Sequence, residues 1–395
     1  MRERFAPARI LGDRNYLLVF LAGTLVMAIN FVLLAYVPVL VVAQGYSTFL
    51  AGLQNTVFAV ASVFLRFYLG PLTDVRGSKT IMLVGAGGFT AGSFLFVFAG
   101  GSYALILAAR LLSAVGMGAY LSAASCYVSE ISTPVTRGIA IGVQRAGYSI
   151  ALMLGPPAMA RAIEGAAGFR GGFAGLAAAG LAALVLLLLV RDTGCRSDGY
   201  FDGVRETARI LQSQAHRQIC SMTLMAGLGF GSVVSYATLY LSEFPSFPNP
   251  GLYLSLFAVG GLIGNLSCGV LMGRLDLQKL ALSYALMLSS GIALLFLVPV
   301  APLPAALASG LLAGCAFPAL LSVAINWLIR VTPAKSRGTA MGLQESSIDT
   351  GVAAGSLVYG LLSFGMLPQT SFLTIGLAPI PVYLFIYSRA TRRNA

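Results

Sequence analysis

The stretch Arg337-Gly-Thr-Ala-Met-Gly-Leu-Gln-Glu-Ser-Ser-Ile-Asp-Thr-Gly351 begins with a repeat of an earlier segment of the chain. Its residues 337–344 share Arg, Gly, Ala, Gly and Gln with Arg137-Gly-Ile-Ala-Ile-Gly-Val-Gln144, at a constant offset of 200 residues. Each copy follows a Thr-Pro pair. A repeat of about half the chain length predicts duplicated halves, which is the parallel-repeat architecture of some membrane transporters.

The same stretch places two carboxylates in an apolar segment. Glu345 and Asp349 are four residues apart and therefore share one face of a helix. A helix that starts at Gly338 carries them roughly 10 and 16 Å into a hydrocarbon core about 30 Å thick. Because charge at that depth costs at least a few kcal/mol, each acid must be neutral, paired or facing water.

The composition is that of a helical protein with many membrane spans. Of the 395 residues, 57% are hydrophobic and only 10% are charged, whereas a soluble protein of this size carries about 25% charged residues. Apolar runs of spanning length recur twelve times, at residues 16–42, 48–69, 80–99, 103–127, 138–162, 172–190, 219–240, 251–272, 280–300, 304–329, 338–362 and 371–387. We therefore predict an all-α polytopic membrane protein with twelve transmembrane helices.

Polar segments divide these helices into halves and orient them. The longest polar segment, residues 191–217, is predicted to be a cytoplasmic linker between an N-terminal six-helix bundle, residues 1–190, and a C-terminal six-helix bundle, residues 218–395. Apart from Arg66, Arg110 and Arg145, which fall inside the predicted helices, the Lys and Arg residues reach one face, and only Arg161 and Arg170 reach the other. By the positive-inside rule both termini are cytoplasmic, in a bacterial-type inner or plasma membrane. The placement of basic residues by membrane topology also explains the excess of 25 Lys and Arg over 13 Asp and Glu. Nucleic acid is therefore not an expected partner.

The sequence offers little that could support catalysis or metal binding. Its five cysteines form no Cys-x-x-Cys pair, and its single histidine, His216, lies in a polar segment. It contains no nucleophile and base pair, no metal-ligand cluster and no phosphate-cradling loop. We therefore expect no enzymatic activity, no metal and no cofactor.

A cytoplasmic loop, Gly70-Pro-Leu-Thr-Asp-Val-Arg-Gly-Ser-Lys79, joins the second and third predicted helices. Its glycines permit close helix approach and a tight turn, and its aspartate can pair with a base or with the N-terminus of a facing helix. The loop resembles the signature loop of the major facilitator superfamily, Gly-x-Leu-Ala-Asp-Arg-x-Gly-Arg-Lys, and matches it at Gly70, Leu72, Asp74, Gly77 and Lys79. Val75 and Ser78 stand where the family prefers bases, and the corresponding segment of the second half, residues 269–279, lacks the aspartate at the equivalent position.

The resemblance covers essentially the whole chain and implies two pseudo-symmetric six-helix bundles. It implies that the first, fourth, seventh and tenth helices line a central cavity, that the second packs against the eleventh, and that the fifth packs against the eighth. Ala151 and Gly155 in the fifth run and Gly260 and Gly264 in the eighth fit a close, sliding crossing of those helices, or plain packing. Gly155-Pro-Pro157 partly resembles the motif typical of family antiporters, so the chain is similar to the drug and proton antiporter-like exporter branch.

Arg110-Leu-Leu-Ser-Ala-Val-Gly-Met-Gly118 in the fourth helix is similar to the family motif Arg-x-x-Gln-Gly-x-Gly, which is associated with proton coupling. Ser113 and Ala114 depart from that motif. Independently of the resemblance, a guanidinium in hydrocarbon needs an anion, a carbonyl or water, unless its side chain extends outward to the membrane surface.

Arg145 occupies the position in the first copy of the repeat that Glu345 occupies in the second. Opposite charges at equivalent sites of duplicated halves predict a pair in the cavity, although Arg66 competes for the same acids. A carboxylate whose arginine partner is exchanged for substrate takes up a proton more readily, so such a pair can couple transport to protons. The alternative is a permanent structural bridge that holds the halves together.

These considerations give three groups of candidate residues. The candidates for proton coupling are Glu345, Asp349 and Arg110. The candidates for the substrate cavity form a mixed aromatic and polar set that suits an amphiphilic organic solute, and they are Asn30, Tyr36, Arg110, Tyr120, Arg145, Tyr236, Phe317 and Glu345. The candidates for gating are Arg66, Gly70, Asp74, Gly77, Lys79, Glu130, Arg137 and Arg337.

The leading functional hypothesis is a proton-coupled exporter of small amphiphilic organic molecules that works by alternating access, as a monomer in the bilayer. A second hypothesis, motivated by the surplus of arginines in the predicted helices, is uptake or exchange of an organic anion. A third is a membrane sensor or scaffold without transport, which the cost of retaining intramembrane charges disfavours. The expected partners are a small-molecule substrate, protons and lipid.

Overall fold

The computed structural model describes residues 10–46, 48–165, 168–194, 203–244, 252–363 and 365–391. Within these residues the secondary structure is helical, without strands. The chain forms two compact units, one of Met1–Thr136, Ile150–Arg209 and Thr332–Leu343, the other of Arg137–Ser149, Ile210–Val331 and Gln344–Ala395. Residues 195–202 of the predicted linker, residues 1–9 and residues 392–395 lie outside the described residues. The predicted domain boundaries therefore stay a prediction.

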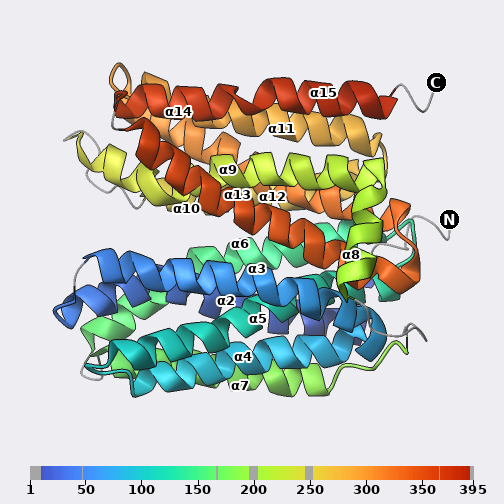
Figure 1. Ribbon diagram of the computed structural model, residues 1–395, viewed down its shortest axis with the longest axis horizontal. Helices are drawn as coiled ribbons and strands as arrows, with labels where there is room; N and C mark the ends of the chain where they lie inside the picture. The colour runs from blue at the N-terminus through green and yellow to red at the C-terminus, as the bar shows by residue number, and fades with distance from the viewer. Residues whose placement is uncertain are drawn as a thin grey trace. The chain divides into compact units, whose positions relative to one another are not determined.

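The first unit is built mainly from long helices of the first half of the chain, which are α2 (Arg14–Ala43), α3 (Thr48–Arg76), α4 (Ser78–Val97), α5 (Tyr103–Ile131) and α7 (Gly168–Leu188). α4 packs against α5 and α7, α3 packs against α5, and α2 packs against α7. Figure 1 shows α4 and α7 running side by side.

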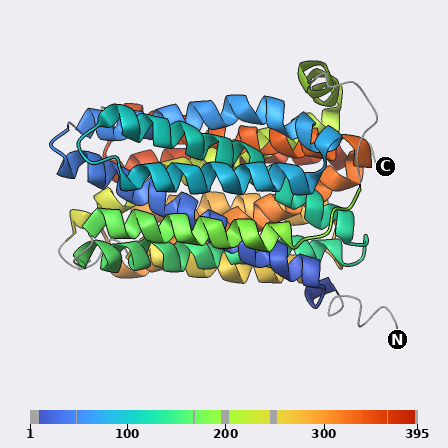
Figure 2. The same cartoon turned by 90° about the horizontal axis from the view of Figure 1, so that it is seen from below.

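The second unit is built mainly from α9 (Gln214–Ser242), α10 (Leu252–Leu271), α11 (Leu277–Ala293) with the 3-10 turn η2 (Leu294–Leu297), α12 (Pro302–Val331), α14 (Pro368–Leu377) and α15 (Pro379–Thr391). α12 packs against α9, α10 and α11, and α11 also packs against α14 and α15. The orange helical segments of this unit that are visible in Figure 2 lie lengthwise, as the helices of the unit do in Figure 1.

Three helices contribute to both units. α6 (Arg137–Glu164) belongs to the second unit up to Ser149 and to the first unit from Ile150. α13 (Arg337–Leu362), which follows the short turn η3 (Ala334–Ser336), belongs to the first unit up to Leu343 and to the second from Gln344. The short α8 (Gly203–Gln212) changes unit after Arg209. The two copies of the sequence repeat thus form the first turns of α6 and α13, the two long helices that are divided between the units.

Local chemistry fixes where several helices begin. The Asp13 carboxylate accepts the backbone N–H groups of Asn15 and Tyr16 at 2.8 and 3.0 Å and so caps α2. Asp276 caps α11 in the same manner. Gly77, with φ of 89°, connects α3 to α4 in a backbone conformation that side chains disfavour, which explains the glycine of the signature loop.

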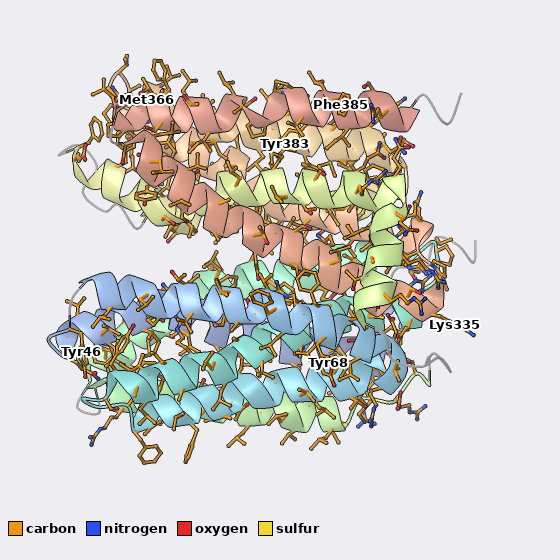
Figure 3. All side chains as sticks on the ribbon, in the orientation of Figure 1. Tyr46, Tyr68, Lys335, Met366, Tyr383 and Phe385 are labelled. Atoms are coloured by element: carbon orange, nitrogen blue, oxygen red, sulfur yellow. The ribbon has the colours of Figure 1, made fainter. Side chains whose placement is uncertain are left out.

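Among the described residues, ten helical segments are long and apolar enough to cross a membrane. They correspond to ten of the twelve predicted runs, and the remaining two runs form α6 and α13, which are long enough but more polar. The last predicted run is divided at Ala378 into α14 and α15, because Pro379 and Pro381 lack the N–H groups that would continue the helix. Exposed apolar side chains such as Met366 and Phe385, labelled in Figure 3, fit contact with lipid tails.

Candidate functional site

An ion pair between Arg145 of α6 and Glu345 of α13 lies inside the second unit. An Arg145 Nη2 atom donates to Glu345 Oε1, and the two residues are only 6% and 3% exposed. The Arg145 guanidinium also lies over the Tyr148 ring, 5.5 Å from its centre. The structure therefore pairs the two repeat-equivalent charges, as the sequence predicted. Asp349, one turn further along α13, is half-buried.

Two glutamines next to this pair were not among the predicted site residues. Gln144 and Gln344 are the final matching residues of the two repeat copies, and they are 1% and 0% exposed. The Gln144 side chain lies within hydrogen-bonding range of the Tyr148 side chain, whereas the Gln344 amide makes no hydrogen bond of good geometry with another described residue. The signal in the sequence was their position in the repeat, directly before Arg145 and Glu345.

A hydrogen-bonded group continues from the ion pair along α6. Ser149, one turn after Arg145, accepts a hydrogen bond from Asn265 of α10 at 3.4 Å. The Asn265 side-chain oxygen accepts the Ser322 hydroxyl of α12 at 2.8 Å. Asn265 and Ser322 are fully buried, so these polar groups satisfy one another inside the helix bundle of the second unit.

Aromatic side chains lie beside this polar group in the second unit. Phe317, a predicted cavity residue, stacks on Phe230 with ring centres 4.2 Å apart, and both rings contact Phe257. The following residue, Pro318, lies with Ser149 against Gly261. The predicted Tyr236 stacks on Tyr359, with ring centres 4.3 Å apart. The second unit therefore contains both a buried charged pair and a cluster of aromatic side chains.

Arg110 lies in the first unit and is fully buried. It donates to the side-chain oxygens of Gln54 and Asn55 and, at 3.1 Å, to the Leu33 carbonyl, while the Phe58 ring lies 5.0 Å from its guanidinium carbon. Among the residues that the structure describes, no carboxylate pairs with it. The alternative in which this side chain extends to the membrane surface is wrong, because neutral groups of α2 and α3 hold it inside.

Asp74 caps the first turn of α13 within the first unit. Its carboxylate accepts the backbone N–H of Gly338 at 2.6 Å, the backbone N–H of Thr339 at 2.8 Å and the Thr339 hydroxyl at 2.7 Å. Close approach of the two helices requires glycine at Gly338, where a Cβ atom would come within 2.7 Å of the Gly70 carbonyl oxygen. This contact agrees with the expected packing of the second predicted helix against the eleventh.

Other gating candidates make contacts at the same end of the first unit. Glu130 accepts the hydroxyls of Ser78 at 2.7 Å and Thr193 at 2.6 Å. Lys79 donates to the carbonyls of Leu188, the last residue of α7, and of Val190, two residues after it.

The remaining candidates are dispersed. Arg66 is 1% exposed and donates to the Met117 carbonyl at 3.4 Å, so it is buried in the first unit together with Arg110. Asn30 and Tyr120 are buried, and Tyr36 is half-buried. Arg137 and Arg337 are the half-buried first residues of α6 and α13.

The fifth and eighth predicted helices, α6 and α10, cross as expected, but Gly155, Gly260 and Gly264 do not make the contact. Gly155 packs against Ala28 and Val32 of α2 in the first unit. Gly260 and Gly264 pack against α12. The contact between α6 and α10 is instead made where Gly142 meets the backbone of Asn265 and Gly269, because the first part of α6 belongs to the second unit.

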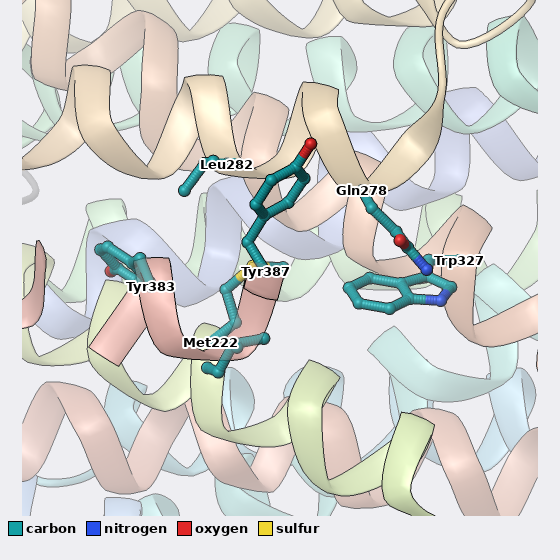
Figure 4. A pocket seen from close by; sticks show the side chains of 7 residues that line it. Met222, Gln278, Leu282, Trp327, Tyr383 and Tyr387 are labelled. Carbon is teal, nitrogen blue, oxygen red and sulfur yellow. The ribbon is translucent and has the colours of Figure 1, made fainter. Parts of the chain in front are cut away.

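A small pocket in the second unit lies away from these groups. It is lined by residues of α9, α11, α12 and α15, namely Met222, Gln278, Leu282, Trp327, Tyr383, Ile386 and Tyr387 (Figure 4). None of the predicted site residues lines it. The buried ion pair of Arg145 and Glu345, with the buried glutamines next to it, is chemically more unusual than this mostly apolar pocket. We therefore take it as the better candidate site.

Comparison with known proteins agrees with this architecture. A family model described as Major Facilitator Superfamily matches residues 19–285 and 219–395. The uncharacterized MFS-type transporter YtbD of Bacillus subtilis is 26% identical over 324 residues, which are 79% of this chain and 79% of that protein. The proton:xylose symporter XylE has a similar structure, with a TM-score of 0.80 over 97% of this chain and 96% of that one at 16% identity. The human organic anion transporter MFSD10 follows with a TM-score of 0.74, 19% identity and coverage of 95% and 99%.

Proposed function

The chain belongs to the major facilitator superfamily, and from that premise we propose that it is a proton-coupled exporter of small amphiphilic organic molecules. It is a multi-pass membrane transporter, and membership of this family confirms that it is not an enzyme. The export direction, the proton coupling, the monomeric state and the cytoplasmic position of both termini belong to the proposal. Alternating access of two six-helix halves is the mechanism that we infer.

The observation that carries the proposal is the buried ion pair between Arg145 and Glu345. Ionised groups inside a membrane protein are expensive to retain and commonly mark a substrate or proton pathway. Removing one partner leaves the other charge buried and unpaired, so each group controls the charge state of the other. A pair of this kind supports proton coupling more strongly than a single buried acid would.

The sign of the coupling depends on which partner the substrate engages. A cationic or hydrogen-bond-donating substrate that binds Glu345 competes with a proton for the same carboxylate, which gives exchange. An anionic substrate that binds Arg145 releases Glu345 to take up a proton. Substrate and proton then cross the membrane in the same direction, which is symport. Export by exchange therefore requires the substrate to engage Glu345.

An amphiphilic substrate suits the side chains of the second unit. Phe230, Phe257 and Phe317 offer aromatic surface, and Phe230 is only half-buried. Binding sites for organic solutes combine apolar walls with a few polar groups that fix orientation. The second unit holds both kinds of group, polar ones on α6, α10 and α13 and aromatic ones on α9, α10 and α12.

The experiment uses protein reconstituted in proteoliposomes, with ethidium as a fluorescent amphiphilic cation and an imposed pH gradient. We expect the gradient to drive ethidium flux, Glu345→Gln to abolish that flux, and Asp349→Asn to reduce it. Unchanged flux in the variant that carries both substitutions would show that the coupling assignment is wrong. A thermal-shift screen against chemically broad ligands at acidic and neutral pH identifies other probes.

A second candidate function is uptake or exchange of an organic anion. The observation that favours it is Arg110, a buried cation that among the described residues is held by neutral groups and pairs with no carboxylate. Such a site attracts a substrate carboxylate. If this function holds, benzoate raises the thermal stability of the purified protein, and Arg110→Gln or Arg145→Gln abolishes that effect while Arg170→Gln does not.

A further inference from the structure

We propose that residues 189–193, which lead from α7 into the predicted linker, form a strap that is docked on the first unit and is released when the start of α13 loses its cap. We call these residues the linker strap. The two ends of one short loop, residues 74–79, hold the cap and the strap, so the docking of the linker follows the state of the cap. The inference goes beyond the proposed function, because it depends neither on the substrate nor on proton coupling.

The linker strap begins with a buried residue. Val190 is only 2% exposed, and its carbonyl accepts a hydrogen bond from the Lys79 ammonium group at 2.6 Å. The same ammonium group donates to the carbonyl of Leu188, the last residue of α7, at 3.1 Å. Lys79 therefore holds the backbone of the chain as it leaves α7 and ties it to the start of α4.

Both backbone groups of Arg191 are bonded to side chains. Its N–H donates to the Asn15 side-chain oxygen of α2 at 3.0 Å, and its carbonyl accepts the Tyr127 hydroxyl of α5 at 2.8 Å. Because Tyr127 is only 1% exposed, its hydroxyl group would lose this partner in a largely buried position if the strap moved away. Contacts from two helices to one residue are those of a docked segment and not of a flexible tether.

Glu130 holds the far end of the linker strap. Its Oε2 atom accepts the hydroxyls of Thr193 at 2.6 Å and Ser78 at 2.7 Å, and its Oε1 atom accepts the Cys126 thiol at 3.3 Å. No base pairs with Glu130 among the residues that the structure describes, and Ser78 stands where the signature loop of the family prefers a base. The carboxylate thus relies on neutral donors, and the linker supplies one of them.

The same loop holds the start of α13. At one end of the loop, Asp74 accepts three hydrogen bonds from the first turn of α13. At the other end, Ser78 and Lys79 hold Glu130 and the strap backbone. Gly77, with φ of 89°, joins the two ends in a tight turn, and Asp74 and Glu130 lie within electrostatic range of each other. A shift of Asp74 therefore displaces the groups that hold the strap.

This arrangement predicts a reciprocal effect. If loss of the cap on α13 favours release of the strap, then release of the strap must weaken the cap, because the coupling between two equilibria acts in both directions. A strap that served only to stabilise the end of the first unit would lack this dependence on α13.

Amide hydrogen exchange, measured by mass spectrometry on the purified full-length protein in detergent, follows both sites at once. Peptides that contain residues 188–194 report the strap, and peptides that contain residues 337–340 report the first turn of α13. Thr193→Val removes one hydroxyl bond to Glu130, and Tyr127→Phe removes the bond to the Arg191 carbonyl. After correction for intrinsic exchange rates, we expect each to speed exchange of the strap by about threefold to tenfold.

Tyr103→Phe is the matched control. It lies at the other end of α5 and removes a bond of the same kind, from the Tyr103 hydroxyl to the Leu50 carbonyl at 2.8 Å. We expect it to leave exchange of both peptides unchanged.

Thr339→Val tests the coupling, because it removes one bond to Asp74 and alters α13 but not the strap. We expect it to speed exchange of the strap by about twofold or more, and we expect Thr193→Val to speed exchange of the first turn of α13 in return. If Tyr127→Phe does not fold, Thr193→Val, whose side chain is only half-buried, gives the same readout.

Two results would overturn the inference. Strap exchange as slow as in the wild type in either Thr193→Val or Tyr127→Phe would show that these hydroxyls do not dock the strap. Absence of either cross-effect between the strap and α13 would show that the two sites are independent. The measurement contains no transport step, so a lack of ethidium flux in proteoliposomes refutes the proposed function and leaves this inference standing.

Discussion

The carboxylate of Asp74 accepts both the backbone N–H and the hydroxyl of Thr339, at 2.8 and 2.7 Å, and so holds the first turn of α13. It also accepts the N–H of Gly338. A carboxylate at this position caps the first turn of the helix and interacts favourably with the helix dipole. Glu345 lies about two turns after this cap on α13, so the contact fixes the start of the helix that carries the buried acid.

Replacing Asp74 with asparagine should weaken this cap. Asparagine keeps the size but has one acceptor oxygen and no charge, so we expect the free energy of unfolding to fall by about 1–2 kcal/mol. Thr339→Val removes only the hydroxyl bond and should cost about 1 kcal/mol or less. Denaturant or thermal unfolding of the purified proteins measures both. Equal stability of Asp74→Asn and the wild type would show that the cap contributes nothing.

The architecture could be predicted from the sequence because the repeat and the apolar runs are local patterns. Every predicted run is helical within the described residues, and the repeat offset alone predicts the pairing of Arg145 with Glu345 that the structure shows. The lengths of α6 and α13 were also predicted, although their division between two units was not. That division depends on which neighbours each turn meets, and no pattern within a single helix records it.

The rest of the candidate site depends on contacts between distant residues. Arg110 finds its partners Gln54 and Asn55 more than fifty positions earlier in the chain, and nothing in the fourth-helix motif points to them. Gln144 and Gln344 stand in the quoted repeat, but only the structure shows that both side chains are buried next to the ion pair. Small residues in the sequence predict a close approach of α6 and α10. Only the structure shows that Gly142 is the residue at the point of contact, against Asn265 and Gly269.

The ion pair itself can be tested for a role beyond stability. Arg145→Met or Glu345→Gln alone leaves one buried charge without its partner, and such changes typically cost about 3–5 kcal/mol. The double variant Arg145→Met with Glu345→Leu removes both charges, so we expect it to be more stable than either single variant in thermal unfolding. We also expect it to remain inactive in pH-gradient-driven ethidium flux. Recovery of both stability and flux in the double variant would establish the pair as a permanent structural bridge.

Close packing of α6 on α10 predicts an asymmetry between two helical glycines. A methyl group at Gly142 would come within 3.0 Å of the Gly269 Cα atom, whereas a methyl group at Gly87 of α4 meets no atom within 4 Å. Gly142→Ala should therefore lower the unfolding free energy by about 1–3 kcal/mol through overpacking. Gly87→Ala should be neutral or stabilising by up to about 1 kcal/mol, because alanine favours the helix. Comparable effects of the two substitutions would contradict the tight approach at Gly142.

The pH dependence of substrate binding decides between the two proposed directions of coupling. If the substrate engages Glu345, protons compete with it, and acidification should weaken ethidium binding by at most about tenfold per pH unit, the limit for one exchanged proton. If the substrate engages Arg145, Glu345 takes up a proton as the substrate binds, and acidification should strengthen benzoate binding within the same limit. Glu345→Gln carries no titrating group at that position, so it should flatten whichever slope the wild type shows. Calorimetry at a series of pH values measures the slope, with Asp349→Asn as the matched control on the same helix. A slope that survives in Glu345→Gln but disappears in Asp349→Asn would assign the coupling proton to Asp349, and the ion pair would then serve to position α13.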